Sequence, residues 1–509
     1  MENLSSSPVP LQGELNSWNS RLAHHLATRI STLRPPAVPL QNPIPALRLL
    51  NRKQWLFFLV ALCGWTWDAF DFFSVSLTTK ALAKSLDVSV KSITWGITLV
   101  LMLRSVGAVI FGLLSDRFGR KWPFIVNCVL FIALELGTGF VQTYKQFLAV
   151  RALFGVAMGG IYGNCAVTAL DDCPLEARGI ISGMLQQGYA LGYLLAVVFN
   201  RALVYTTSQG WRSLYWFGAG PPVLIIFFRL CLPENDAYLA QRFAEGEDSK
   251  AAFFKAANKS VKEYWHVLIY MVILMAGFNF MSHGSQDLYP TMLDIQLEFS
   301  ADKQTVTMAV ANLGAIVGGI FFGHISETVG RRLTIIIASV LGGALIYPWA
   351  FVRNNGIMAA VFFLQFMVQG AWGVIPIHLS ELSPPALRAF IVGVSYQLGN
   401  LASSASSTIE TTIGDRFPLA DTAQSEAASV ERYDYGKVMA IFMGCVFAFV
   451  LIVTFLGPEN HISAQELHAG MKRELHDNLR LLEQQKLDVS HKEQNKLPAT
   501  EGDGTTEKI

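Results

Sequence analysis

Polar side chains recur at helical spacing along one stretch of an otherwise apolar segment. Asn279, His283 and Asp287 are four residues apart, so a helix would place them on one face. Asn279 lies within the apolar stretch 265–281, and His283 and Asp287 follow it. This stretch is long enough to begin a membrane span. Polar and ionisable groups are costly in lipid and mark a functional site by default. We call this set the polar ladder: Asn279, Ser282, His283, Gln286, Asp287 and Thr291.

Three functions compete for the polar ladder. It could hold helices together through hydrogen bonds, coordinate a metal, or bind a substrate and a proton. A single histidine with one carboxylate is too small a ligand set for a dedicated metal, so we expect none. Packing explains Asn279 and Ser282 but requires neither charge of the pair His283 and Asp287. Because histidine titrates near neutral pH, the pair favours a substrate and proton site.

Arg104 is the second costly residue, since it interrupts the apolar segment 92–114. A guanidinium cannot release its proton to reduce the cost of burial, so it requires an anion. That anion is either a structural partner in a neighbouring span or a transported carboxylate held by paired hydrogen bonds. The sequence leaves both open, and the structural candidates are Asp68, Asp71 and Glu135.

The composition predicts the setting of these residues. Of 509 residues 52% are hydrophobic and 15% are charged, which is typical of a polytopic membrane protein. The net charge of +1 gives no sign of a nucleic-acid partner. Apolar runs of about 20 residues predict an all-α membrane protein with twelve spans. We expect them at 55–77, 92–114, 122–141, 147–169, 178–200, 212–231, 265–287, 305–325, 333–352, 357–379, 387–410 and 436–457.

The spans divide the chain into five parts. We expect an amino-terminal segment at 1–54, a six-helix bundle at 55–231, a linker at 232–264, a second bundle at 265–457 and a tail at 458–509. The basic turns after the second and eighth spans favour the cytoplasmic side, which places both termini and the linker in the cytoplasm. Lys80, Lys84 and Lys91 lie in the first outer loop and oppose this orientation, but we weigh them less than the two basic turns.

The two halves repeat short motifs in the same order. Gly112 to Lys121 follows the second span, and Gly323 to Arg332 follows the eighth, 211 residues later (323 minus 112). Such repeats predict two bundles related by an axis normal to the membrane, with substrate bound between them. Charged pairs present in only one state can latch a gate. The gating candidates in the two turns are Asp116, Arg117, Arg120, Glu327 and Arg331.

The turns resemble the signature of the major facilitator superfamily over residues 50–460. A more specific resemblance lies in the polar ladder, where residues 279–291 contain every fixed position of N-x-x-S/T-H-x-S/T-Q-D-x-x-x-T. This motif is similar to that of the fungal Jen-type lactate permeases, which are carboxylate/proton symporters of the sialate/proton symporter branch. Residues 65–71 and 186–190 also resemble the corresponding stretches of these permeases.

The resemblance implies proton-coupled uptake of short monocarboxylates such as lactate, pyruvate and acetate across the plasma membrane. Family members also recognise dicarboxylates. By position, the polar ladder falls on the substrate and coupling helix of the family. A span-five aromatic residue that tunes substrate size in the family aligns near Leu191, where this chain departs. The remaining substrate-binding candidates are Arg104, Asn279, Gln286 and Gln397, with Gln187 either lining the cavity or packing.

Proton coupling is expected at His283 and Asp287. Asp68 and Asp71 are alternative proton carriers, or they neutralise Arg104. The proton is the only coupling ion we expect, with no cofactor, and we expect a monomer in the bilayer. Phosphate-binding loops, nucleophile elbows and zinc spacings do not occur, which argues against an enzyme. Dicarboxylate, sialate or sugar transport by the same fold, and a transport-inactive nutrient sensor, remain as alternatives.

Overall fold

The computed structural model describes residues 23, 25–33, 42–204, 206–239, 250–354, 356–384, 387–420 and 433–459. Within these ranges the regular secondary structure is helical, apart from one isolated bridge between Pro418 and Tyr433. Eleven helical segments are long and apolar enough to cross a membrane. They coincide with eleven of the twelve expected spans, which confirms the all-α membrane class.

The first six spans are built from ten helical elements, several of which join end to end. Short interruptions at Gly160, Gln187 and Ala219 divide the fourth, fifth and sixth spans. The elements are α3 (Arg52–Leu86), α4 (Val90–Phe118), α5 (Lys121–Phe140), α6 (Tyr144–Gly159), α7 (Ile161–Leu170), α8 (Arg178–Gln186), α9 (Gly188–Phe199), η3 (Asn200–Val204), α10 (Trp211–Gly218) and α11 (Gly220–Cys231). Before them lie η1 (Ser31–Leu33) and α2 (Pro43–Arg48), and η2 (Leu175–Ala177) precedes α8.

The last six spans follow the same plan. The expected eleventh span at 387–410 is present as two helices that meet at Ser404 and Ala405, and each is too short to count alone as a spanning helix. Eleven segments and this divided one make twelve. The elements are α13 (Lys250–Gln286), α14 (Tyr289–Thr291), η4 (Met292–Gln296), α15 (Ala301–Val329), α16 (Arg331–Ala344), α17 (Ile346–Phe351), α18 (Ile357–Leu382), α19 (Arg388–Ser403), α20 (Ser406–Gly414) and α22 (Tyr435–Leu456).

The linker differs from the expectation in one respect. Helix α13 begins at Lys250, inside the predicted linker 232–264, and continues without a break into the seventh span. Residues 250–264 contain neither Gly nor Pro and are rich in Ala and Lys, which favour a helix. A search for apolar runs alone cannot detect this polar beginning of the helix.

The two basic turns have the same backbone. Helix α4 ends at Gly119 with a φ of 95°, and α15 ends at Gly330 with a φ of 96°. Side chains disfavour this left-handed region, so glycine allows the chain to reverse and start α5 or α16 at once. We refer to the end of the molecule that holds both turns as the basic-turn end.

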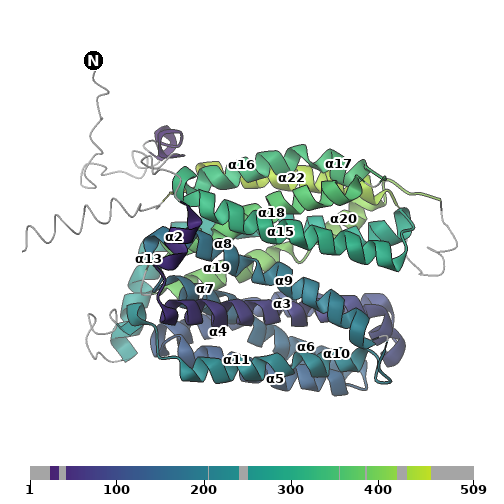
Figure 1. Ribbon diagram of the computed structural model, residues 1–509, viewed down its shortest axis with the longest axis horizontal. Coiled ribbons are helices and arrows are strands. Elements are labelled where there is room, and N and C mark those ends of the chain that lie inside the picture. Colours follow the sequence, from purple (N-terminus) through teal and green to yellow (C-terminus); the bar gives the residue numbers. More distant parts are fainter. Residues whose placement is uncertain are drawn as a thin grey trace, which may run out of the picture. The chain divides into compact units, whose positions relative to one another are not determined.

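The halves meet through closely packed helices. Figure 1 shows α8 and α19 between the layer of α3 and α4 and the layer of α15 and α18, and these helices contact one another across the halves. A Cβ at Gly183 would lie 3.2 Å from the Cα of Gly323, and one at Gly163 would lie 3.0 Å from the Cα of Gly393. Small residues permit such approach in membrane helices. The interface therefore positions side chains of both halves around one centre.

Candidate functional site

A small pocket lies at this centre and takes side chains from both halves. Helices α3, α4, α8 and α9 supply one wall, and α13, α18 and α19 supply the other. Its lining combines one arginine and one histidine with amides and aromatic rings. The lining residues are Phe72, Leu101, Arg104, Gln186, Tyr189, Asn279, Ser282, His283, Gln369, Trp372, Tyr396 and Asn400.

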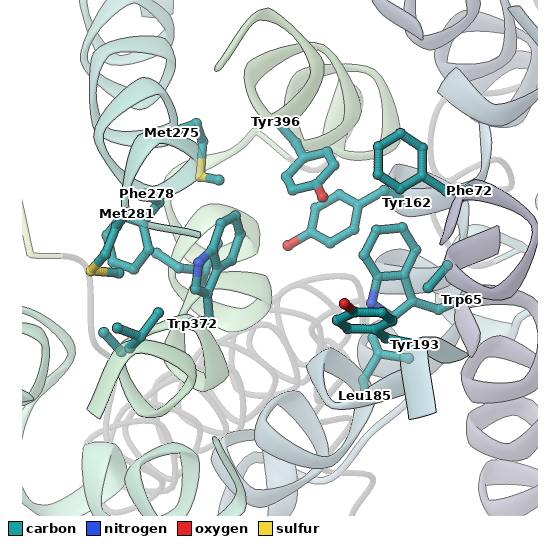
Figure 2. Packing of buried hydrophobic residues seen from close by; sticks show 14 of the residues in the cluster. Trp65, Phe72, Tyr162, Leu185, Tyr193, Met275, Phe278, Met281, Trp372 and Tyr396 are labelled. Carbon is teal, nitrogen blue, oxygen red and sulfur yellow. The ribbon is translucent and has the colours of Figure 1, made fainter. Parts of the chain in front are cut away.

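Aromatic rings bring the two walls together. The ring of Tyr396 stacks on Tyr162 with centroids 4.0 Å apart. Trp65 and Trp372 approach Tyr396 edge-on, each at 5.8 Å. In Figure 2, Tyr396 and Tyr162 lie between Trp372 on one side and Phe72 and Trp65 on the other. The rings lower the local polarity around the pocket, which strengthens electrostatic interactions beside them.

Arg104 forms an ion pair with Asp68 at the pocket wall. The Nη2 atom of Arg104 donates to Asp68 Oδ2 over 2.8 Å, and the two side chains are 2% and 0% exposed. The guanidinium also lies over the Phe72 ring, 5.5 Å from its centroid. No described residue accepts a hydrogen bond from its Nε atom. The choice between structural and transported anion thus has a partial answer: Asp68 is the partner here, and the Nε–H donor has no partner among the described residues.

The polar ladder provides the opposite wall. His283 Nδ1 lies 3.0 Å from Asp287 Oδ2, and the Asn400 amide contacts the same imidazole. Asn279 donates through Nδ2 to the Met275 carbonyl at 2.8 Å on its own helix. His283 lines the pocket, whereas Asp287 lies one turn away with a side chain that is 39% exposed. The pair therefore connects the pocket to more accessible surroundings.

Three other predicted binding residues lie beside the central pocket without lining it. Gln286 lines a neighbouring pocket, where its Nε2 donates to Gln365 Oε1 at 3.2 Å. Gln397 is fully buried and accepts from Asn400 Nδ2 at 3.0 Å, which links it indirectly to His283. Gln187 Nε2 lies 3.4 Å from the Gln369 carbonyl, so it packs between the halves. Their predicted roles in binding remain predictions.

Leu191 is the position near which the span-five aromatic residue was expected, and its role in tuning substrate size remains a prediction. It lines neither pocket, whereas Tyr189 lines the central pocket and Tyr193 lines the neighbouring one. On helix α9, positions 189 and 193 share a face and position 191 lies on another. The aromatic residues facing the pockets are therefore present in this chain, two positions before and after the predicted one.

Several lining residues were not predicted from the sequence. Gln369, Trp372, Tyr396 and Asn400 stand on α18 and α19 within otherwise apolar spans. A single buried amide or aromatic residue in such a span is common and carries little signal. The spacing of Tyr396 and Asn400, four residues apart beside Gln397, was the only available hint.

The gating candidates form two matching networks at the basic-turn end. Arg120 pairs with Asp116 at 2.8 Å and with Asp171 at 3.4 Å. In the second half, Arg331 pairs at 2.8 Å with Glu327 and at 2.8 Å with Glu381. Both arginines are buried. The guanidinium of Arg117 lies 5.8 Å from the centroid of the Phe118 ring.

Two of these acidic residues also join the halves. Asp116 on α4 accepts from the backbone N–H groups of Ala389 at 3.2 Å and Phe390 at 2.8 Å, at the start of α19. Asp171 pairs with Arg388 at 2.8 Å. Carboxylates are favourable at a helix N-terminus, so Asp116 stabilises the start of α19 and joins the halves at the basic-turn end.

Each turn is completed by an acidic residue after the last helix of its half. Glu234 accepts from the backbone N–H groups of Arg120 at 3.0 Å and Lys121 at 3.1 Å. Glu459 accepts from those of Arg331 at 3.0 Å and Arg332 at 3.0 Å. Burial raises the pKa of Glu459, and these backbone hydrogen bonds oppose that shift.

Comparisons with known proteins agree with this architecture. A family model described as "Sugar (and other) transporter" matches residues 54–467. A "Carboxylic acid transporter protein homolog" of Saccharomyces cerevisiae is 44% identical, over 82% of this chain and 70% of the relative. The "Sialic acid transporter NanX" of Escherichia coli is 24% identical, over 70% of this chain and 87% of that protein.

Solved structures show the fold alone. The proton:xylose symporter XylE, bound to 6-bromo-6-deoxy-D-glucose and described as a major facilitator superfamily protein, superposes with a TM-score of 0.66. The match covers 82% of this chain and 98% of that one at 18% identity. The twelve-helix arrangement predicted from the sequence is therefore confirmed.

Proposed function

Because the chain belongs to the sugar (and other) transporter family, we propose that it carries short monocarboxylates such as lactate across the plasma membrane together with a proton. The carboxylic acid class is supported by the name of the relative that is 44% identical. The preference for monocarboxylates and the proton follow from the charges of the pocket. In this account both termini face the cytoplasm and uptake is inward.

The ion pair between Arg104 and Asp68 carries the proposal. Its arginine lines the pocket and keeps one N–H donor without a described acceptor. A substrate carboxylate entering the pocket would bind this guanidinium through charge-assisted hydrogen bonds. It would do so in competition with the carboxylate of Asp68.

The number of charges in the pocket favours a substrate with one carboxylate. Arg104 is the only arginine or lysine in its lining, and His283 is the only other group there that can become cationic. A second carboxylate would face amides and aromatic rings, where an uncompensated charge is costly. A dicarboxylate therefore requires His283 to be protonated, whereas a monocarboxylate does not.

The same competition explains why a proton would accompany the substrate. Once the substrate occupies Arg104, Asp68 is a buried carboxylate without its cation, and a proton removes that charge. His283 and Asp287 form a second place where a proton can reside, on the opposite wall. Substrate anion and proton then cross together when the halves rock and the contacts at the basic-turn end open.

Uptake measurements test this function. Labelled lactate is added to cells without carboxylate carriers at about pH 5.5 and about pH 7.5, which bracket the usual histidine pKa. We expect uptake to be faster at the lower pH and to be lost in Arg104→Gln but retained in Arg353→Gln, whose arginine is exposed. Surface expression is measured for every variant.

Other outcomes would redirect the proposal. Uptake of dicarboxylates, sialate or sugars without lactate uptake would keep the fold and change the substrate. Lactate binding to purified protein without any flux would indicate a sensor. Full lactate uptake by Arg104→Gln would contradict the role given to the ion pair.

A further inference from the structure

The second half contains a buried carboxyl group outside the two pockets. Glu410 on α20 is 0% exposed and lines neither of them. Neither of its carboxyl oxygens has a hydrogen-bond partner among the described residues. An ionised carboxylate without a donor or a cation is costly to bury, whereas a protonated carboxyl group is neutral. The surroundings of Glu410 therefore favour a carboxylic acid that holds a proton.

Among the described residues, the helices packed against α20 supply no positive partner for this carboxyl. Helix α20 contacts α13 and α22. The single lysine of α22, Lys437, is 54% exposed and pairs with Asp434 at 3.4 Å. The charged neighbour that acts on Glu410 is instead Asp287, just beyond the end of α13. A like charge nearby makes an ionised Glu410 still less favourable. The other titratable side chains of α22 are Tyr435 and Cys445, and neither donates a hydrogen bond to Glu410.

The eleventh span follows the polar ladder and meets it at two levels. On α19, the Asn400 amide contacts the imidazole of His283. Further along the span, on α20, Glu410 neighbours Asp287. Because Asp287 also pairs with His283 at 3.0 Å, these groups form a connected row. The row leads from the central pocket at His283, through Asp287, to Glu410.

The members of this row differ in their access to solvent. The Asp287 side chain is 39% exposed, whereas Glu410 is 0% exposed. Protons from solvent therefore reach Asp287 first, and Glu410 can exchange a proton with it. The break at Ser404 and Ala405 separates α20 from α19, whose start is joined to Asp116 at the basic-turn end. Glu410 thus stands on the part of the span that lies away from that end.

We propose that Glu410 is the storage site of the transported proton in the second half. While no substrate is bound, the O–H bond of a protonated Asp287 breaks, an O–H bond forms on Glu410, and Asp287 is again a carboxylate. When a substrate anion displaces Asp68 from Arg104, the proton returns to Asp287 and passes through His283 toward the pocket. One proton is moved in each cycle. This inference rests on the proposed function, because it assigns a place to the proton that accompanies the substrate.

Transport assays of Glu410→Gln test the storage role. The amide has the shape and neutrality of the protonated acid but cannot release a proton. We expect this variant to keep the exchange of labelled for unlabelled lactate at equal pH on both sides, and to lose uphill accumulation driven by a pH gradient. Asp415→Asn, at an exposed site just after α20, should keep both activities. Glu410→Asp, which restores a titratable group, should recover part of the accumulation.

Two results of these assays would overturn the proposal. Full uphill accumulation by Glu410→Gln would show that the carboxyl only fills space, since glutamine fills the same space. Loss of exchange as well as accumulation, at normal surface expression, would show that Glu410 serves a step other than proton storage.

Infrared difference spectroscopy of the purified, full-length protein tests the stored proton without any substrate. Near neutral pH, we expect Glu410→Gln to lose the carbonyl band of one protonated carboxylic acid, and Asp415→Asn to lose none. Glu410→Leu, which keeps the site apolar, gives the same comparison if the glutamine variant does not fold, as judged by size exclusion. An unchanged band would show that Glu410 is ionised and would overturn storage. If the unaltered chain does not carry lactate, the proposed function fails while this spectrum still decides whether Glu410 holds a proton.

Discussion

The two halves of the protein match at the basic-turn end and differ at the pocket. At the turns, each half places one buried arginine between two carboxylates, Arg120 in the first and Arg331 in the second. At the centre, the first half contributes the fixed cation Arg104, whereas the second contributes amides and the titratable pair of His283 and Asp287. The repeat thus preserves the charged turns, whereas the ionisable groups at the pocket are divided unequally between the halves.

This difference assigns separate tasks to the halves. The first half holds a fixed charge that can attract an anion. The second half offers groups that donate hydrogen bonds or change charge with pH. An anion and a proton can then bind from opposite walls of one pocket.

The largest expected effect tests the match at the turns. Arg331→Met leaves Glu327 and Glu381 without their shared cation, and Arg120→Met does the same to Asp116 and Asp171. We expect each variant to lose about 3–5 kcal/mol of folding stability, the usual cost of breaking a buried ion pair. Unfolding by denaturant in mixed micelles measures it. A large loss in one variant with little in the other would break the equivalence of the halves.

The second prediction concerns the charged wall. Asp68→Asn removes the carboxylate that competes for Arg104, so lactate is expected to bind roughly tenfold tighter, in line with one charged hydrogen bond regained. Uphill accumulation at acid pH should fall at the same time, because Asp68 no longer binds a proton. Titration calorimetry and uptake against a gradient measure the two effects. Weaker binding would contradict competition for Arg104.

The third prediction concerns the titratable wall. His283→Gln keeps hydrogen-bonding capacity but cannot become cationic. A protonated histidine attracts an anion and forms below its pKa. Without it, the rise in uptake at low pH should shrink by up to about tenfold, which is the change in affinity expected when one charge contact is lost. The initial rate of lactate uptake is measured from about pH 5.5 to about pH 7.5. An unchanged pH profile would exclude His283 from coupling.

The smallest effect is expected at the contact between the halves. Asp116→Asn weakens the ion pair with Arg120 within the first half. Between the halves it weakens a cap on α19 that is worth about 1 kcal/mol, which corresponds to roughly fivefold in the closing equilibrium. The basic-turn end should open more often, as reported by labelling of a cysteine introduced near Gly112. Glu327→Gln, in the matching position against Gly179, is the comparison variant. Equal labelling in all three proteins would show that these carboxylates do not hold the gate.

The sequence predicted the elements whose signals are local. Apolar runs located the spans, the glycine turns located their short connections, and the polar ladder located one pocket wall. Asp116, Arg120, Glu327 and Arg331 were recognised because they stand at matching positions of the short motif that the two halves repeat. The positions of Arg104 and His283 at the pocket followed from the cost of burying such groups.

The remaining features depend on contacts between distant segments. Arg120 meets Asp171, and Arg331 meets Glu381, fifty or so positions apart in the chain, and no local pattern encodes either pair. The break at Ser404 is a local bend between two short helices that hydropathy does not register. Which residue near Leu191 faces the pockets also depends on the fold, because a step of two residues turns a helical side chain to another face.

The most direct test is the movement of protons with lactate in proteoliposomes that contain the purified chain. An inward lactate gradient should acidify the lumen, with about one proton entering per lactate as charge balance requires for a monocarboxylate. The rate should not change when the membrane is clamped electrically with potassium and valinomycin. Lactate entry that leaves the internal pH unchanged, or that carries net charge, would contradict proton-coupled transport through the pocket between Arg104 and His283.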